Sequence, residues 1–175
     1  LLYPLRRQRQ MCIRDRIKGA RLRYRTWDQQ LADALTADFA MDQALETRYE
    51  KLSRGQRAMV AIVIGLASGT DLLLLDEPYV GLDTHNTDVS YRHLLAQAET
   101  GRTIVMATHH IDDAAKVLDT AVILGREGVV AKQCAPEDAD SFAVAGGELL
   151  PIDAASRHAC PAHFDDLIEH YLEVY

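Results

Sequence analysis

The sequence predicts an α/β fold built around a mostly parallel sheet, and three observations support this prediction. The run LLLL at residues 72–75 is continuously apolar, as a strand is when both of its faces are buried in a parallel sheet. A second short apolar run, TIVMAT, occupies residues 103–108. Segments with the apolar periodicity of helices precede, separate and follow these runs, so helices and strands alternate along the chain.

Two helices are expected before the first strand. Apolar side chains recur every four residues over the first of them, which predicts an amphipathic packing helix: Trp27, Leu31, Leu35 and Phe39. Residues 55–67 have hardly any polar side and predict a buried helix, for which Ser53 is the expected N-cap.

The second half of the chain continues the alternation. A polar-faced helix is expected over residues 84–99 and another over 111–118, followed by the strand TAVILG and a hairpin at 125–128 that closes onto VVAK. The end of the chain predicts a closing amphipathic helix with five side chains on one side: Phe164, Leu167, Ile168, Tyr171 and Leu172.

Length and composition predict one compact soluble domain, or most of one, because 175 residues with 48% apolar side chains can fill a core. No apolar run reaches the roughly 18 residues of a membrane span, and no signal peptide opens the chain, so a cytosolic protein is expected. The cysteines are three and widely spaced, which predicts reduced thiols rather than disulfides: Cys12, Cys134 and Cys160.

The charge is unevenly distributed. The chain carries -7, yet five arginines and one aspartate give residues 1–16 a positive charge. A basic head could be a nucleic-acid arm. However, MCIRDR at residues 11–16 back-translates to codons that resemble the transposon mosaic end used in sequencing libraries. We therefore expect residues 1–16 to be a sequencing-adapter artefact and the native reading frame to begin near Ile17.

Polar residues at the ends of these elements predict a site. Asp76 and Glu77 close the LLLL strand, where ligands of open α/β sheets collect, and adjacent carboxylates there suit a metal or a water; the alternative is a solvated turn. Ser53 stands at a helix start, where free N–H groups and the helix dipole favour an anion such as phosphate. His109 ends the second strand, where a structural role is the alternative.

Four ordered motifs, LSRGQ, LLLLDEP, GLD and ATHH, resemble those of the ATP-binding cassette (ABC) ATPases over about residues 27–132. The resemblance implies a P-loop NTPase-like cassette with a mostly parallel sheet core and part of the helical signature subdomain. The sequence is similar above all to bacterial export-type transporter cassettes, whose signature reads LSRGQ.

The resemblance also implies the roles of the site residues. The signature would contact the γ-phosphate of ATP held by a partner cassette through three residues: Ser53, Gly55 and Gln56. Asp76 would hold Mg²⁺ through water, and Glu77 would orient or activate the attacking water. Asp83 would correspond to the D-loop aspartate, and His109 to the switch histidine that reads the γ-phosphate.

Two features depart from the family pattern. Arg54 replaces the usual glycine of the signature, which predicts a tolerated variation. No GxxxxGKS or GxxxxGKT occurs in the 175 residues, and Gln29 and Gln30 lie too near the signature to be the Q-loop. We therefore expect a fragment that hydrolyses ATP negligibly alone, with residues 17–134 as a partial ATPase domain and 135–175 as a carboxyl-terminal extension.

The expected partners are a transmembrane permease and a second cassette, in a homo- or heterodimer, with no nucleic acid. The expected location is the cytoplasmic face of the cell membrane, reached through the permease. One alternative is a degenerate, non-catalytic cassette that completes the site of a dimer partner. Another is a non-transport ABC ATPase, although the long heptad coiled coils of the chromosome-maintenance type do not occur here. His158, Cys160 and His163 could form a metal site, with a polar loop as the alternative.

Overall fold

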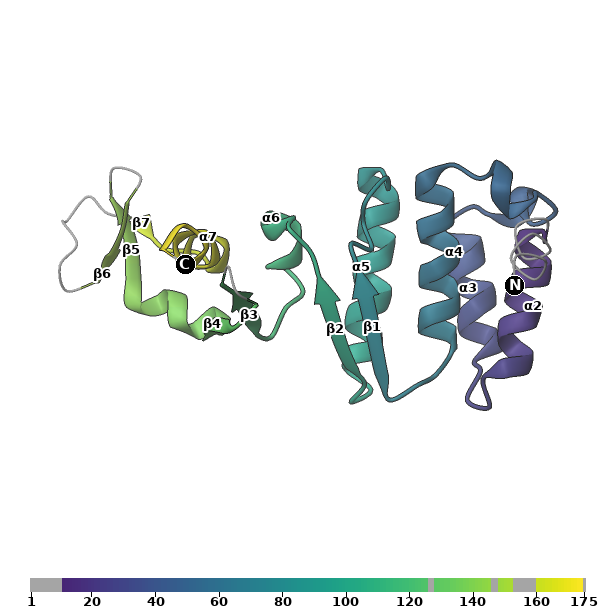
Figure 1. The fold of residues 1–175 in the computed structure, drawn as a ribbon, viewed down its shortest axis with the longest axis horizontal. Helices are drawn as coiled ribbons and strands as arrows, with labels where there is room; N and C mark the ends of the chain where they lie inside the picture. The colour runs from purple at the N-terminus through teal and green to yellow at the C-terminus, as the bar shows by residue number, and fades with distance from the viewer. Residues whose placement is uncertain (1–10, 126–127, 146–147, 153–159, 175) are drawn as a thin grey trace. The chain divides into compact units, whose positions relative to one another are not determined.

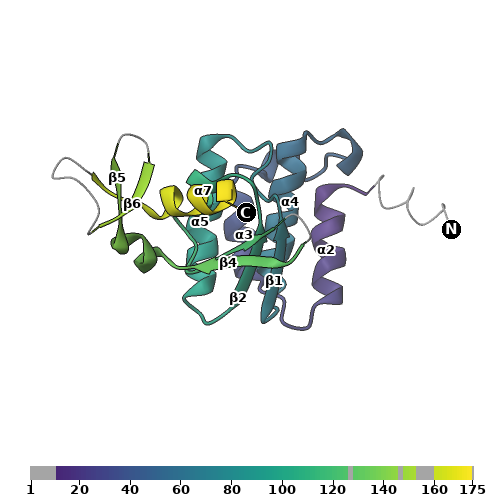
Figure 2. The same cartoon turned by 60° about the vertical axis from the view of Figure 1, so that its left-hand side comes forward.

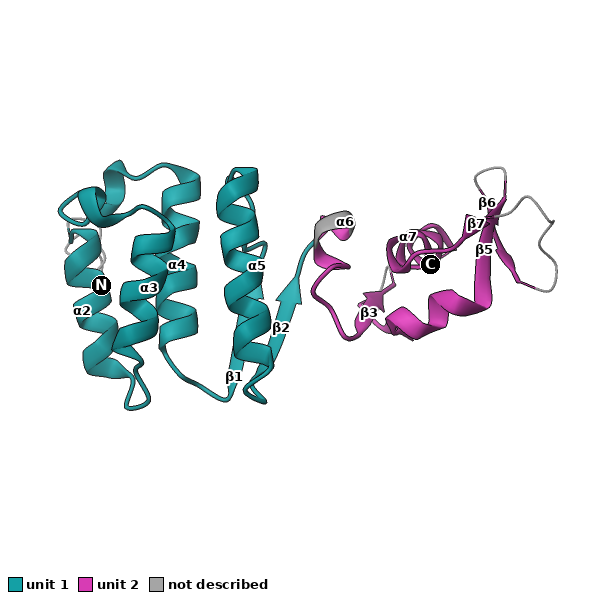
Figure 3. Ribbon diagram, turned by 180° about the vertical axis from the view of Figure 1, so that it is seen from behind, with its two compact units in different colours: residues 1–108 teal, residues 109–175 magenta. Residues whose placement is uncertain are grey.

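The structure is a computed structural model that describes residues 11–125, 128–145, 148–152 and 160–174. The chain forms two compact units, Leu1–Thr108 and His109–Tyr175 (Figure 3). No helix among the described residues is long and apolar enough to span a membrane.

The first unit combines helices with a pair of parallel strands (Figure 1). Its elements, in chain order, are α2 (Ile13–Arg23), α3 (Gln29–Asp38), the 3-10 turns η1 (Asp42–Ala44) and η2 (Tyr49–Lys51), α4 (Arg54–Ala67), β1 (Leu72–Asp76), α5 (Thr84–Ala98) and β2 (Thr103–Ala107). Helix α2 begins within the segment that the sequence assigns to an adapter, and its first residue, Ile13, is buried.

Helix α3 is shorter than the apolar spacing predicts. Asp28 caps it by accepting a hydrogen bond from the Leu31 amide at 2.9 Å, so Trp27 lies before the first turn rather than on the helical face. The Trp27 indole donates to Gln29 Oε1 instead. Of the other residues of the predicted stripe, Leu35 and Phe39 are buried and Leu31 is half-buried.

Helix α4 is the buried helix that the sequence predicts, with Ser53 as its N-cap. It contacts α2, α3 and α5, and Gly65 brings its backbone against the side chain of Leu73 in β1. In both Figure 1 and Figure 2, α4 lies between α2 and α5. The apolar run is buried because neighbours surround α4 on most sides.

The carboxyl-terminal end of α4 is held by Arg102, the residue immediately before β2. Arg102 donates to the carbonyl oxygens of Leu66 (2.7 Å) and Gly65 (2.9 Å) and to the hydroxyls of Ser68 and Thr70. These carbonyls lie in the last turn of the helix, where they also accept from the Ser68 hydroxyl and the Gly69 amide, and a cation suits the negative end of the helix dipole. Arg102 thereby fixes the end of α4 to the strand pair.

Strands β1 and β2 pair in parallel, as predicted, with Asp76 opposite Ala107 at their carboxyl ends. The prediction that the first strand is buried on both faces is wrong for this chain. Leu73 is buried, but Leu72 and Leu74 are 52% and 68% exposed, and Val105 lies 51% exposed on β2. Successive side chains of a strand point to opposite faces, and α4 packs against the Leu73 face.

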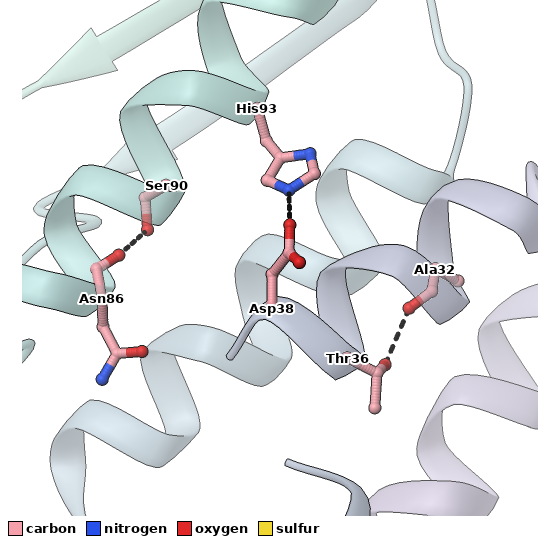
Figure 4. A network of polar contacts seen from close by, with 6 residues as sticks. All are labelled: Ala32, Thr36, Asp38, Asn86, Ser90 and His93. Atoms are coloured by element: carbon pink, nitrogen blue, oxygen red, sulfur yellow. Dashed lines mark hydrogen bonds and ion pairs between the residues drawn. The ribbon is translucent and has the colours of Figure 1, made fainter. Parts of the chain in front are cut away.

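Helices α3 and α5 are joined by a polar contact (Figure 4). His93 Nε2 lies 2.7 Å from Asp38 Oδ2, across 55 residues of sequence. The hydroxyls of Thr36 and Ser90 turn back onto their own helices and donate to carbonyl oxygens four residues earlier.

The second unit combines antiparallel strands with a closing helix. Its elements are α6 (Ile111–Ala114), β3 (Ala121–Leu124), β4 (Val130–Cys134), η3 (Pro136–Ser141), β5 (Phe142–Ala145), β6 (Glu148–Pro151), β7 (Cys160–Pro161) and α7 (Phe164–Val174). Strands β3 and β4 form the predicted hairpin. The sheet in the order β6-β5-β7 was not predicted from the sequence.

Helix α7 closes the core of this unit. Its buried residues Phe164, Leu167 and Ile168 pack with Ile123 and Cys134. Two predictions are corrected here. Leu172 is 47% exposed, because it falls at the edge of the apolar face of α7. The helix expected over 111–118 ends at Ala114, where the hydrogen-bonding pattern tightens and the Val117 amide donates to the Ala114 carbonyl.

Candidate functional site

The predicted site residues of the first unit gather at one end of it. Parallel strands β1 and β2 end at the same edge, and the first turns of α4 and α5 lie at this end of the unit (Figure 1). Helix α4 runs from this edge to the opposite end, where Arg102 holds it. Strand ends and helix starts are the usual places for ligands in α/β folds.

Ser53 and Gln56 form a reciprocal capping box at the start of α4. The Gln56 amide donates to Ser53 Oγ at 3.1 Å, and the Ser53 amide donates to Gln56 Oε1 at 3.0 Å. Both bonds use acceptor atoms of the side chains. The hydroxyl hydrogen of Ser53 and the side-chain NH₂ group of Gln56 can therefore still donate hydrogen bonds to a ligand. The Ser53 side chain is exposed, as a contact with a partner's nucleotide requires.

The two residues between them differ in environment. Arg54 is exposed in the first turn of α4. Gly55 is buried, and a Cβ added to it would lie 2.2 Å from the carbonyl oxygen of Gly81. Gly55 is thus required by packing, and its contact with phosphate stays a prediction.

The two carboxylates lie at the end of β1 in different environments. Asp76 is the last residue of the strand and is exposed, whereas Glu77 is half-buried. Glu77 has a φ of 45°, a conformation that is uncommon for residues other than glycine and often found at functional sites. Its amide donates to the Ala107 carbonyl at 2.8 Å, which continues the strand pairing past Asp76.

Thr108 is a residue of this site that sequence reasoning missed. Its hydroxyl donates to Glu77 Oε2 at 3.1 Å from the end of β2. The signal was present, because Thr108 belongs to the ATHH motif and follows the strand that was expected beside β1. The motif indicates a role for the histidine, whereas the parallel register of β1 and β2 brings the preceding residue, Thr108, to the Glu77 carboxylate.

Asp83 has a structural role in addition to its predicted one. It is the N-cap of α5, and its Oδ1 accepts a hydrogen bond from the Asn86 amide at 2.8 Å. Such a cap is worth about 1 kcal/mol. Its predicted D-loop role stays a prediction.

The predicted switch histidine opens the second unit. His109 is exposed, and its ring lies 4.2 Å from that of His110, centroid to centroid. Its proximity to Glu77 stays a prediction. Of the candidate metal group in the tail, Cys160 and His163 are exposed, and His158 lies outside the described residues.

Residues 5–80 match the family model described as ABC transporter, a range that holds the LSRGQ and LLLLDEP motifs. Over residues 5–80 the chain therefore matches the ABC ATPase family. The recognition made from the four motifs is therefore confirmed. The match begins inside residues 1–16, whose origin stays a prediction, and it ends before Asp83 and His109.

Similar proteins carry the names of ATP-binding proteins of transport systems. One is the energy-coupling factor transporter ATP-binding protein EcfA3 of Oenococcus oeni, 41% identical over 87 residues that cover 50% of this chain and 30% of that protein. Another is a probable anion import ATP-binding protein of Haloferax volcanii, 36% identical over 124 residues, 61% of this chain and 43% of that protein. The cassette chain thus spans less than half the length of these relatives.

Solved structures confirm the α/β cassette fold. The ATP-binding subunit of an ABC transporter superposes with a TM-score of 0.67 at 22% identity, over 75% of this chain and 55% of that one. At this identity the likeness concerns the fold alone.

Proposed function

We propose that this chain is part of an ATP-binding cassette subunit that hydrolyses ATP to power transport through a membrane permease. The observation that carries the proposal is one edge of the first unit, where the capped start of α4 exposes Ser53 and the end of β1 presents Asp76 and Glu77. Transport is supported by the relatives, which are named as the ATP-binding proteins of an energy-coupling factor transporter and of anion import.

The start of α4 is suited to bind phosphate oxygens. Ser53 and Gln56 each use an acceptor atom to cap the helix and retain donor hydrogens for a ligand. The helix dipole adds a partial positive charge at the same place. Because Ser53 is exposed, we infer that its ligand is a nucleotide held mainly by a second cassette.

Glu77 is suited to orient a water for attack on the γ-phosphate. The Thr108 hydroxyl donates to Oε2, which restricts the rotation of the carboxylate, and an ionised carboxylate has lone pairs enough to accept a hydrogen bond from a water as well. General-base assistance of this kind contributes about 10²- to 10⁴-fold to the rate. We therefore assign Glu77 to turnover rather than to nucleotide binding, and His109 to sensing the γ-phosphate.

The same edge fits Mg²⁺ in the nature of its donors. Asp76 offers an exposed carboxylate at the strand end, and Mg²⁺ prefers oxygen ligands of this type while keeping several waters. We propose that Asp76 holds the ion through water. When bound, the ion neutralises charge on the phosphate oxygens.

The sequence contains no phosphate loop of its own, which supports the proposal that this chain is a fragment of the cassette. The same observation favours a second candidate, a non-catalytic cassette whose signature completes the site of a partner. Both candidates place Ser53 on a partner's nucleotide. They differ in the role of Glu77, because this carboxylate contributes to hydrolysis only where a phosphate loop of the same protein holds ATP.

The direction of transport is a finer proposal. The LSRGQ signature resembles export-type cassettes, whereas the anion import relative carries an import name. We propose a peripheral position at the cytoplasmic face of the membrane, on the permease. Reconstitution of the subunit with its permease in vesicles measures the direction as ATP-dependent loss or gain of a transported solute.

Hydrolysis by the chain tests the proposed function. We expect negligible turnover of MgATP by the chain alone, and turnover on mixing it with a cassette that has a phosphate loop but a disabled signature serine. The variant Ser53→Ala should abolish this restored turnover. Ser141→Ala, a matched change of an exposed serine in the second unit, should preserve it. Ordinary cassette rates from the chain alone, or equal rates with Ser53→Ala, would contradict the proposal.

A further inference from the structure

Two glycines far apart in sequence meet backbone to backbone in the first unit. Gly55 lies in the first turn of α4, and Gly81 lies in the turn between β1 and α5 with a φ of 88°. A Cβ on Gly55 would lie 2.2 Å from the Gly81 carbonyl oxygen, and a Cβ on Gly81 would lie 3.1 Å from the Gly55 nitrogen. Neither position accommodates a side chain without movement of the other backbone.

The contact is rigid because no side chain separates the two segments. A long side chain can change rotamer to relieve a close approach, but backbone atoms within capped and hydrogen-bonded turns cannot. On one side, the Ser53–Gln56 capping box fixes the turn. On the other, the Leu82 amide donates to the Tyr79 carbonyl and the Val80 amide to the Glu77 carbonyl.

This second set of bonds leads directly back to Glu77. The segment from Glu77 to Asp83 is a series of turns that begins at the carboxylate and ends at the cap of α5. A displacement of the first turn of α4 therefore changes the position of a segment whose other end carries Glu77. The contact joins the predicted phosphate donors of the chain to its predicted catalytic carboxylate.

We propose that Gly55 and Gly81 are positioning residues, whose contact holds the Ser53 turn and the Glu77–Asp83 segment as one body, so that a phosphate bound at Ser53 sets the position of Glu77. The effect on Glu77 rests on the function proposed above. The mechanical coupling of the two segments does not, because it requires no nucleotide.

An asparagine at position 81 adds a side chain with less backbone strain than most residues would bring, because asparagine tolerates positive φ better than they do. The chain offers a matched control in Gly101, which has a φ of 87° and no atom within 4 Å of its Cβ position. Hydrogen exchange resolved by residue is measured at the amides of Gln56, Leu82 and Asn86, and at Ser68 at the far end of α4.

We expect Gly81→Asn to accelerate exchange at Gln56, Leu82 and Asn86 by about tenfold or more, with little change at Ser68. Gly101→Asn should leave all four unchanged. A general loss of structure would instead accelerate exchange along all of α4. Equal profiles for the two variants would overturn the proposal.

The unchanged chain supplies a second measurement, which applies even if Gly81→Asn fails to fold. The denaturant dependence of exchange should show one common opening for Gln56 and Leu82, distinct from that of Ser68. Independent openings of Gln56 and Leu82 would overturn the coupling. The two proposals can fail separately. If Gln56 and Leu82 open together but the Ser53→Ala variant restores full turnover, the contact between Gly55 and Gly81 holds and the proposed function is refuted.

Discussion

Thr108 donates a hydrogen bond of 3.1 Å to the carboxylate of Glu77, across the carboxyl ends of the two parallel strands. The bond engages one carboxylate oxygen of a residue that is also held in an uncommon backbone conformation, with φ at 45°. Backbone and side chain of Glu77 are thus both fixed from β2, since its amide donates to the Ala107 carbonyl. Fixing the carboxylate before a ligand arrives lowers the cost of orienting it.

Removal of this bond should slow hydrolysis. In a cassette read from the native gene with its phosphate loop, we expect Thr108→Val to lower kcat by about tenfold, the kinetic equivalent of one hydrogen bond of ordinary strength, with KM little changed. Thr108→Ser keeps the hydroxyl and should retain most of the rate. Thr103→Val, the same change at the exposed start of β2, is the control. Equal rates for the two valine variants would exclude an orienting role for Thr108.

Replacement of Glu77 by glutamine should separate binding from turnover. In the same cassette we expect Glu77→Gln to retain MgATP binding and to accumulate a nucleotide-trapped dimer, while hydrolysis falls by about 10²-fold or more. Size-exclusion chromatography with bound-nucleotide assay measures the dimer. Unchanged steady-state hydrolysis would refute the role assigned to Glu77.

Arg102 should be a major contributor to the stability of the first unit. Burial lowers the pKa of its guanidinium, an effect that nearby Asp71 partly opposes, yet the group is compensated by bonds to two carbonyls and two hydroxyls. We expect Arg102→Met to lower the free energy of unfolding by about 2–4 kcal/mol, because it removes the charged donor of the end carbonyls of α4 and leaves them with the Ser68 hydroxyl and the Gly69 amide.

Urea unfolding measures this loss. Arg92→Met changes an exposed arginine of α5 and should cost less than about 0.5 kcal/mol. Arg102→Lys should recover part of the loss, because lysine keeps the charge but not the planar fork of donors. A loss for Arg102→Met no greater than for Arg92→Met would show that the four bonds contribute nothing.

The thiols should differ in reactivity and in their effect on stability. Burial, and secondarily Asp138, raise the pKa of Cys134, while Lys132 opposes the change. A raised pKa in the folded state means that the neutral thiol stabilises the fold fully below the unfolded pKa of about 8.5 and that this stability is lost as the pH rises further. We therefore expect alkylation of exposed Cys160 first and of Cys134 last.

The pH dependence is checked by urea unfolding at pH 8 and pH 10. The loss of stability between these values should be smaller in Cys134→Ala than in the unchanged chain, because the variant removes one group that titrates in this range. Cys160→Ala should show the full loss. Equal losses in the two variants would mean that Cys134 ionises alike in the folded and unfolded states.

The local features of this chain were predictable from short stretches of sequence. Ser53 and Gln56 are three residues apart and form their capping box within one turn, and the apolar run that follows has the pattern of a buried helix. Asp76 and Glu77 were placed correctly at a strand end, because a leucine run closed by two acids and a proline has few other readings. The family could be recognised for the same reason, since its motifs are short and ordered.

Other features depend on residues that are far apart in sequence. The close approach of Gly55 and Gly81, the Thr108 hydrogen bond to Glu77 and the capture of the α4 terminus by Arg102 each join segments separated by 26 residues or more, and no periodicity encodes them. The strands β5, β6 and β7 were not predicted, because short strands are stabilised by pairing with other strands and carry little signal in their own sequence.

The sequence by itself determined which elements form and which chemical groups they carry, because helix periodicity, capping and strand composition act within a few residues. Only the tertiary structure decided which of these groups meet, and that the apolar strand β1 leaves Leu72 and Leu74 exposed. The physical reason is that burial and close contact are properties of pairs of surfaces, and a strand's composition does not state how many of its faces are covered.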